Sequence, residues 1–365
     1  MGPMFPLRTT IDLSAIAHNT RLLAEHAGDA KLMCVIKADA YNHGVERCVP
    51  VMEAGGADAF GVATLGEARR IRELTDKPVL AWLWSIGEEI PDGIHVGVPT
   101  TEHLQVLIDD PTPRTVYLMV DTGMHRSGID EAQWDDAFRR AREAEQRGQI
   151  EVAGLMSHLA CADNPLDPYT DAQADTFRRA IDAAREAGLA VPCNHIANSP
   201  ATWTREDLHF DMVRPGVSLY GLEPVVGLEH GLKPAMTWTG QVVAVKPMKQ
   251  GEPTSYARTW EAPEDGFTAV VPAGYADGVH RSWQGALEIT IGDQTYQQVG
   301  RVSMDQIVVW LGDNAAGVKA GDEAIIFGDG GRSATDLAKA AGTINYEVVC
   351  APGGRTHRSY TGEES

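Results

Sequence analysis

Short apolar runs alternate with longer amphipathic stretches from residue 11 to about residue 220. An apolar run bounded by turn residues is typical of a strand buried on both faces, and an amphipathic stretch of helical period is typical of a covering helix. Repetition of this pair predicts βα units around a parallel sheet. The runs that qualify as strands are 32–36, 59–63, 79–84, 95–98, 116–120, 152–156, 193–197 and 212–213.

Eight such runs are the number that a closed barrel needs. We therefore expect a (β/α)8 barrel of the TIM type rather than an open doubly wound sheet, because no GxGxxG motif follows the first strand. The helices between the runs carry clear end signals. In one of them Asp167 is the expected N-cap, Pro168 the first helical residue and Gly188 the stop.

After Leu222 the pattern changes to short apolar runs separated by turns, which predicts a mainly β second domain. The runs are 240–245, 267–271, 287–291, 306–310 and 323–327. One late helix is expected over 335–341, with Thr335 as its cap and Gly342 as its stop. We expect a barrel over 11–232, a β domain over 233–365, and an N-terminal segment, 1–10, that packs on the β domain.

Composition narrows the class of protein. With 43% hydrophobic and 22% charged residues, the 365-residue chain is typical of a globular enzyme. A net charge of −20 disfavours nucleic acid and anionic membranes, since no local basic patch opposes it. The five cysteines form no CxxC pair and no zinc spacing, which predicts reduced thiols, no metal and a cytoplasmic location. We find no signal segment and no apolar stretch near about 18 residues.

A lysine follows the first apolar run directly. Lys37 is either a surface charge whose stem lies along the sheet or a desolvated amine able to form a Schiff base. Barrel enzymes carry their chemistry at the carboxyl ends of the strands, so the polar residues that end the other runs bear on this choice. They are Arg126, His158, His195, Asn198, Ser199 and Arg214.

Each of these residues also has a structural interpretation. His158 can be a core histidine with its hydrogen bonds satisfied, Arg214 a cap before Pro215, and Asn198 the N-cap of a short helix. Together, however, Ser199 and the backbone amides near Gly216 form a donor set suited to a phosphate. A lysine facing a phosphate site indicates pyridoxal phosphate.

Eight motifs in order along the chain resemble those of the alanine racemase family, pyridoxal phosphate enzymes with a barrel and a C-terminal β domain. They are Lys37-Ala38-Asp39-Ala40-Tyr41, Asp121-Thr122-Gly123-Met124, Asn198-Ser199, Arg214-Pro215-Gly216, Ser255-Tyr256, Gly274-Tyr275-Ala276-Asp277-Gly278, Ser303-Met304-Asp305-Gln306 and Asn345-Tyr346-Glu347.

The resemblance implies racemisation of alanine by two bases, in a homodimer that shares its active sites and supplies D-alanine for peptidoglycan precursors. Lys37 would hold the cofactor and act on one face of Cα, and Tyr256 of the partner subunit would act on the other. Inversion needs this pair, because one base tends to return the proton to the side it left. His158 is the matching candidate to ease ionisation of the tyrosine.

The remaining site residues are also implied by the resemblance. The cofactor would contact Lys37, Tyr41, His158, Asn198, Ser199, Arg214, Gly216, Val217 and Tyr346. Arg126, Met304 and Tyr275 would contact the substrate, with His195 and Asp305 in support. Arg214 would face the pyridine nitrogen, and since an arginine stays protonated it cannot protonate the ring, which favours racemisation over transamination.

The chain departs from the family pattern at three positions. Met119 stands where many members have a carbamylated lysine that orients the arginine, so we expect Arg126 to be held by another residue or by a bound anion. Asn42 and His125 stand where glycines are common, and they either tune specificity or fill space.

Three alternatives remain open at this point. A broad-specificity racemase of the same fold would share nearly every feature. A fold-related decarboxylase would need a negatively charged partner for the ring nitrogen, which Arg214 is not. A non-catalytic pyridoxal phosphate carrier would have no use for the β domain that supplies Tyr256.

Overall fold

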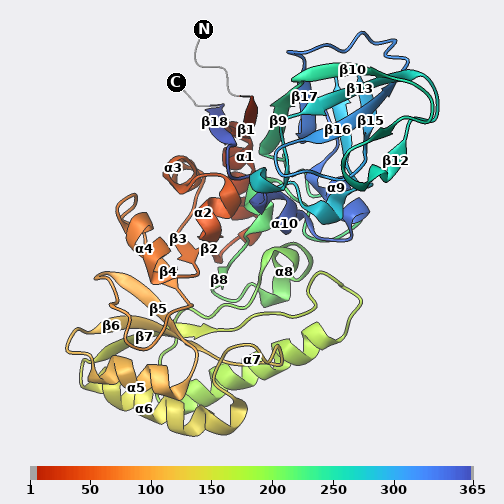
Figure 1. The fold of residues 1–365 in the computed structure, drawn as a ribbon. Helices are drawn as coiled ribbons and strands as arrows, with labels where there is room; N and C mark the ends of the chain where they lie inside the picture. Colours follow the sequence, from red (N-terminus) through yellow and green to blue (C-terminus); the bar gives the residue numbers. More distant parts are fainter. Residues whose placement is uncertain (1–5, 363–365) are drawn as a thin grey trace. The chain divides into compact units, whose positions relative to one another are not determined.

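The computed structural model describes residues 6–362 and divides into two compact units (Figure 1). The barrel unit comprises Ile16–Ala40 and Gly44–Lys233. Among the described residues the β unit comprises 6–15, Tyr41–His43 and 234–362. Helix α1 (Leu13–Ala27) and the turn α2 (Lys37–Asn42) each contribute residues to both units.

The barrel unit contains a parallel sheet in the order β7-β6-β5-β4-β3-β2-β8. Its strands are β2 (Lys31–Val35), β3 (Ala59–Val62), β4 (Val79–Ala81), β5 (Ile94–Val98), β6 (Arg114–Met119), β7 (Ile150–Met156) and β8 (Met212–Val213). The segment 193–197 completes the ring, because His195 N donates to Leu155 O (3.0 Å) and Arg214 N donates to Ala197 O (2.9 Å). The predicted barrel is confirmed, with an irregular seventh strand.

Helices cover the outside of this sheet, as Figure 1 shows for α5, α6 and α7 around β5 to β7. They are α3 (Val45–Ala54), α4 (Leu65–Arg72), α5 (Thr101–Asp109), α6 (Trp134–Gln146), α7 (Tyr169–Glu186) and α8 (Ser199–Thr204), with short 3-10 turns η1 (Glu131–Gln133), η2 (Glu206–Leu208) and η3 (Val217–Tyr220). Pro168 is the N-cap of α7 and not its first helical residue; Asp167 accepts a hydrogen bond from Tyr169 N at 2.9 Å.

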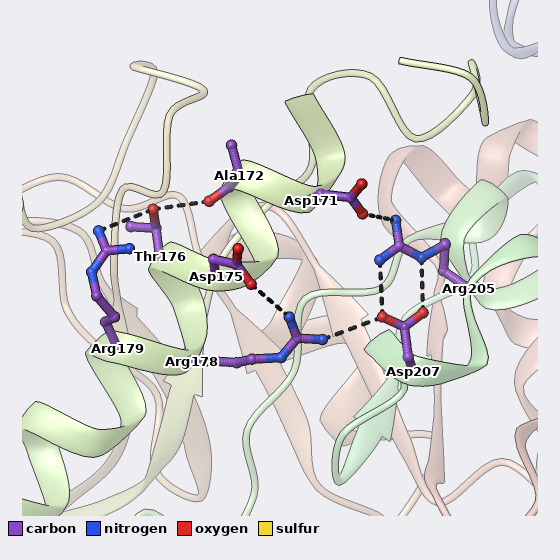
Figure 2. Close-up of polar contacts among 8 residues, drawn as sticks. All are labelled: Asp171, Ala172, Asp175, Thr176, Arg178, Arg179, Arg205 and Asp207. Carbon is purple, nitrogen blue, oxygen red and sulfur yellow. Dashed lines mark hydrogen bonds and ion pairs between the residues drawn. The ribbon is translucent and has the colours of Figure 1, made fainter. Parts of the chain in front are cut away.

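An ion-pair network ties the start of α7 to the turn η2 (Figure 2). Arg205 contacts Asp207 through two hydrogen bonds of 2.8 and 2.9 Å and reaches Asp171 at 2.7 Å. Arg178 joins Asp175 (2.9 Å) to the same Asp207 (3.2 Å). Since these carboxylates are half or more exposed, solvent and salt screen the network.

The β unit is built on a nine-stranded sheet in the order β10-β13-β16-β15-β14-β17-β9-β1-β18. Its strands are β1 (Leu7–Asp12), β9 (Met236–Gln241), β10 (Ala244–Met248), β13 (Gly266–Val271), β14 (Glu288–Ile291), β15 (Gln294–Val299), β16 (Ile307–Gly312), β17 (Glu323–Phe327) and β18 (His357–Thr361). A separate hairpin pairs β11 (Pro253–Thr254) with β12 (Trp260–Glu261). β1 lies between antiparallel β9 and parallel β18, so both ends of the described chain meet in this sheet.

Two details of the predicted β domain were wrong. The run 240–245 is divided between β9 and β10, because Val242 N donates to Asp322 O while Val243 N donates to Val270 O. The late helix α9 (Ala334–Ala341) is capped by Ser333, whose hydroxyl accepts from Asp336 N at 3.0 Å, and not by Thr335. Gly342 ends it as expected, with φ of 70°. The unit also contains α10 (Asn345–Cys350) and the turns η4 (Tyr256–Arg258), η5 (Tyr275–Asp277) and η6 (Arg281–Trp283).

Within residues 6–362, no helix has the length and apolar character needed to cross a membrane.

Candidate active site

The turn that follows β2 has a left-handed backbone. Five consecutive residues without glycine, from Ala38 to Asn42, have φ between 50° and 67°. For L-residues this conformation costs about 1–2 kcal/mol each, so other interactions must hold it. Glu67 accepts a hydrogen bond from Ala38 N at 2.7 Å, and Asp39 accepts one from Val45 N at 3.1 Å. Lys37, half-buried, is thereby anchored where the barrel strand ends.

Arg214 is buried at the end of the neighbouring strand β8. Its guanidinium donates to Ser157 O at 2.6 Å and to His195 O at 3.0 Å, and it contacts the ring nitrogens of His195 and His158 at 2.6 and 3.4 Å. Burial lowers the pKa of Arg214 to about 10, which still leaves it protonated at neutral pH.

Three cations of the barrel unit act on His158. Its pKa is lowered to about 3, first by burial and then by the charges of Arg214, Arg126 and Lys37. The imidazole is therefore neutral at physiological pH. The three cations around it create a positive potential suited to an anionic ligand.

The hydroxyl of Ser199 and the backbone amide of Gly216, both predicted to bind an anion, lie next to each other. Ser199 Oγ lies 2.8 Å from the backbone nitrogen of Gly216, which donates to it. Val217 follows at the start of η3 and is fully buried. Asn198 caps α8 by accepting from Ala201 N at 3.3 Å, as its structural interpretation predicted. The hydroxyl and the amide are thus placed together on one side of the barrel opening.

Arg126 lies in the loop after β6, whose fold is set by Asp121. The Asp121 carboxylate accepts from Gly123 N (2.8 Å) and from His125 N (3.1 Å). Arg126 is exposed and makes no hydrogen bond or ion pair with any other residue in the described range 6–362. It lines an open pocket of about 360 Å³ together with Pro99, Thr100, Asp121, His125, Ser127, Gly128 and Asp130.

The two positions that replace family glycines have positive φ. His125 has φ of 53° and Asn42 has φ of 67°. Glycine adopts this region without strain, and asparagine and histidine are among the side chains that tolerate it best. The tolerance of asparagine and histidine for positive φ explains how these two side chains are accommodated.

In the β unit, Tyr256 and Tyr275 border one pocket. The pocket has a volume of about 460 Å³ and is also lined by Arg281, Arg301 and Val302. Tyr256 is 70% exposed and Tyr275 45% exposed, so both hydroxyls are accessible in this unit. Sequence reasoning missed Arg281 and Arg301, since neither lies in a motif or ends a barrel strand.

A buried carboxylate holds the loops that carry Tyr275 and Met304. Asp277 is 0% exposed and receives two hydrogen bonds from Arg355, of 2.8 and 2.7 Å; Arg355 also reaches Asp305 at 2.8 Å. The backbones of the two loops join directly, with Tyr275 N donating to Ser303 O at 3.0 Å. Asp305 therefore helps to hold these loops in place through its contact with Arg355.

Tyr41 and Tyr346 lie together in the same unit. Their ring centroids are 6.1 Å apart. Burial raises the pKa of Tyr41 well above its usual range, with smaller contributions from Tyr346 and Cys350. The Tyr41 hydroxyl therefore keeps its proton and can donate a hydrogen bond.

The structure thus distributes the predicted site residues between the two units. The barrel unit holds Lys37, Arg126, His158, His195, Asn198, Ser199, Arg214, Gly216 and Val217, and the β unit holds Tyr41, Tyr256, Tyr275, Met304, Asp305 and Tyr346. In the described part of the chain no cluster of His, Cys, Asp or Glu side chains is arranged to bind a metal ion. The barrel opening thus carries the amine of Lys37, the guanidinium of Arg214, the hydroxyl of Ser199 and the amide of Gly216. These groups are typical of a barrel enzyme that binds an anionic ligand.

Comparison with known proteins identifies the family. The family model "Alanine racemase, N-terminal domain" matches residues 11–224, and "Alanine racemase, C-terminal domain" matches residues 235–360. The chain belongs to the alanine racemase family.

Relatives resemble it over their full length. The alanine racemase of Corynebacterium efficiens is 59% identical over 98% of this chain and 99% of its own, and that of Mycobacterium tuberculosis is 43% identical over 97% and 96%.

Among solved structures, alanine racemase from Corynebacterium glutamicum has a TM-score of 0.90 at 52% identity, covering 98% of this chain and 100% of its own. That from Streptomyces lavendulae has a TM-score of 0.94 at 36% identity, with 99% and 98% covered. The structure from Bartonella henselae, with covalently bound pyridoxal phosphate, has a TM-score of 0.90 at 25% identity, with 98% and 100% covered.

Proposed function

We propose that this protein interconverts L-alanine and D-alanine with pyridoxal phosphate held by Lys37. The observation that carries the proposal is the buried Arg214 guanidinium at the end of β8, 3.4 Å from His158, with Lys37 just after the neighbouring strand β2; these cations create a positive potential. A cofactor with a phosphate and a substrate with a carboxylate both suit that positive potential. When bound, the cofactor supplies the electron sink that makes the α-proton of the amino acid removable.

We assign the cofactor phosphate to uncharged hydrogen-bond donors, namely hydroxyl groups and backbone amides. From the barrel unit the assigned donors are Ser199 Oγ and the amides of Gly216 and Val217; the Gly216 amide, which donates to Ser199 Oγ in this structure, would be shared with the phosphate. Tyr41 and Tyr346 supply hydroxyls from the β unit. Asn198 contributes by capping α8, which begins at Ser199. These N–H and O–H groups can donate hydrogen bonds to phosphate oxygens without any change in their protonation state.

Arg214 faces the ring nitrogen of the cofactor in this proposal. Because its pKa is only lowered to about 10, it remains a cation at neutral pH and gives no proton to the ring. His195 and Ser157 O hold the guanidinium from behind. This arrangement limits how much charge the ring accepts, which favours return of a proton to Cα over amino transfer.

Inversion at Cα is assigned to two bases on opposite faces, Lys37 and Tyr256 of the partner subunit. The 70% exposure of Tyr256 supports its use outside its own subunit, and hence a homodimer. Arg126 binds the substrate carboxylate, the Met304 backbone amide contacts the cofactor and substrate oxygens, and Tyr275 restricts the entrance to small side chains. We assign the enzyme to the cytoplasm, where reduced cysteines are stable.

The test follows the α-proton and the optical rotation separately. Wild type incubated with L-alanine in D2O should exchange the α-proton and lose optical rotation. Lys37→Ala should abolish both. Tyr256→Phe should still bind the cofactor and exchange the α-proton of one enantiomer, but should invert about 10²- to 10⁴-fold more slowly, which is the usual contribution of a positioned proton-transfer group.

Equal loss of exchange from both enantiomers in Tyr256→Phe would contradict the two-face assignment. Release of carbon dioxide by the wild type would indicate a decarboxylase, and no change in either signal would indicate a carrier. Comparable rates with larger amino acids would indicate a broad-specificity racemase.

A further inference from the structure

Asn42 bridges three segments of the β unit with its side chain. Its amide nitrogen donates to Pro352 O at 2.7 Å and to Val349 O at 3.3 Å, and its amide oxygen accepts from Arg358 Nη2 at 2.6 Å. The turn α2, the end of α10 and strand β18 are thus joined through one side chain. A residue that merely filled space in place of glycine would not make this set of bonds.

The amide group of Asn42 donates hydrogen bonds to backbone carbonyls at the carboxyl end of α10. Val349 is in the last turn of that helix, where backbone carbonyls have no partner within the helix. Both amide hydrogens of Asn42 are used on backbone carbonyls. The charge of Arg358 strengthens the bond to the amide oxygen, since hydrogen bonds from an ionised donor are stronger than neutral ones. Asn42 therefore fixes where α10 lies relative to residues 41–43 of the same unit.

The residues on either side of this bridge are Tyr41 and Tyr346. Tyr41 immediately precedes Asn42, and Tyr346 is the second residue of α10. Their ring centroids are 6.1 Å apart. Both hydroxyls are assigned to the cofactor phosphate, so their separation has to match the spacing of phosphate oxygens. The Asn42 side chain is bonded from the turn both to the helix end and to β18.

We propose that Asn42 is a positioning residue that holds Tyr41 and Tyr346 at the spacing the cofactor phosphate requires. This inference rests on the function proposed above. Asn42 is a position where the chain departs from the family pattern. The proposal gives its side chain a positioning role, in contrast to a residue that only fills space. Asparagine suits the role because it tolerates φ of 67° while supplying two donors and one acceptor.

The test compares pyridoxal phosphate with pyridoxal, which lacks the phosphate. The full chain is freed of cofactor and titrated with each compound, following absorbance. Asn42→Gly keeps the backbone conformation but removes the bridge, and should weaken pyridoxal phosphate binding about tenfold, as expected for the loss of a hydrogen-bonded constraint. Binding of pyridoxal should change less than about twofold, since this compound has no phosphate for Tyr41 and Tyr346 to contact.

Asn314 provides a matched control. It also has a left-handed backbone, with φ of 54°, and its side chain bonds Val318 O at 3.0 Å and Val318 N at 2.8 Å in another loop. Asn314→Gly should leave both affinities unchanged. Asn42→Asp should behave like Asn42→Gly or worse, because a carboxylate cannot donate to the two carbonyls.

Hydrogen exchange of the cofactor-free protein gives a second readout, with faster exchange expected at the α10 amides in Asn42→Gly only. If Asn42→Gly does not fold, Arg358→Met, which removes the charged donor to the Asn42 amide oxygen, should show the same selective loss in smaller degree. Equal weakening of both compounds, or of neither, would overturn the role of Asn42. A wild type that binds pyridoxal as tightly as pyridoxal phosphate would overturn the phosphate assignment itself, and the inference with it.

Discussion

The Nη1 atom of Arg214 lies 2.6 Å from Nδ1 of His195. A guanidinium only donates, so Nδ1 of the histidine must accept and its ring proton must be on Nε2. Nε2 is buried without a hydrogen-bond partner in the range 6–362, and the ring packs against Tyr117 with centroids 4.7 Å apart. Burial and then the charge of Arg214 lower the pKa of His195. The positive charge is therefore kept on Arg214.

Acid should destabilise the protein through His195 and His158, because both have lowered pKa values in the folded state. Unfolded histidines bind protons below about pH 6.5 while these two stay neutral, so the unfolded state gains protons first and stability falls with pH. For His158 the loss is about 2 kcal/mol at pH 5, and His195 adds to it in the same direction. For His158 the loss should continue down to about pH 3, the folded-state pKa.

Urea unfolding at pH 7.5 and pH 5.0 measures this effect. His195→Asn, which keeps an acceptor but cannot be protonated, should reduce the difference between the two free energies of unfolding. His357→Gln, a change at an exposed histidine, should leave the difference as it is in the wild type. An unchanged difference in His195→Asn would contradict the assignment.

Arg214→Met should destabilise the fold as well as impair the site. The substitution leaves Ser157 O and the Nδ1 and carbonyl oxygen of His195 without the guanidinium that now donates to them. A buried acceptor left unpaired costs about 1–3 kcal/mol, and we expect about 3 kcal/mol in total because neighbours relax. Thermal and urea unfolding of the variant give the value. A loss below about 0.5 kcal/mol, the range of ordinary surface changes, would be inconsistent with this network.

Arg355→Met should destabilise the protein more than Arg205→Met. Arg355 neutralises the fully buried Asp277, whose carboxylate would be left without its cation. Removing one partner of a buried pair costs about 3–5 kcal/mol, and we expect a smaller loss here because Arg355 itself is half-exposed. Arg205 contacts half-exposed or more exposed carboxylates, so its replacement should cost about 1 kcal/mol or less.

The two variants should also differ in their response to salt. Raising the salt concentration should shrink the effect of Arg205→Met, since exposed pairs are screened, and leave most of the effect of Arg355→Met. Unfolding at low and high ionic strength checks this. The reverse order of salt sensitivity would show that the Asp277 pair is open to solvent.

Met119→Lys should not raise activity in bicarbonate. Met119 packs, partly buried, beside Trp82 against the apolar core of the barrel, where a carbamate would lose its hydration. We expect an anion to serve Arg126 instead, because its guanidinium has no hydrogen bond or ion pair within residues 6–362. Racemisation rates of wild type and variant, with and without bicarbonate, are the measurement. A sharp rise in the variant would refute the bound-anion explanation.

Local pattern predicted much of the barrel, because a buried strand and an amphipathic helix each leave a short-range signature. Lys37 and Arg214 could be singled out since each ends an apolar run, and strand ends in a barrel meet at one opening. The irregular seventh strand was found by the same pattern, although its hydrogen bonds come from residues far along the chain. Strands and helices of this kind can be predicted because they depend on residues that are close together in the sequence.

The tertiary structure alone decided the features that depend on distant partners. No propensity predicts five L-residues with positive φ at Ala38–Asn42, because their conformation is unfavourable locally and is held by bonds from outside the turn. The carbonyls that Asn42 binds lie 307 and 310 residues further along the chain. The sequence determined the barrel, the family motifs and the position of Lys37 after the first barrel strand through short-range pattern. The proton position on His195 and the bridge at Asn42 arise only when folding brings remote groups within hydrogen-bond distance.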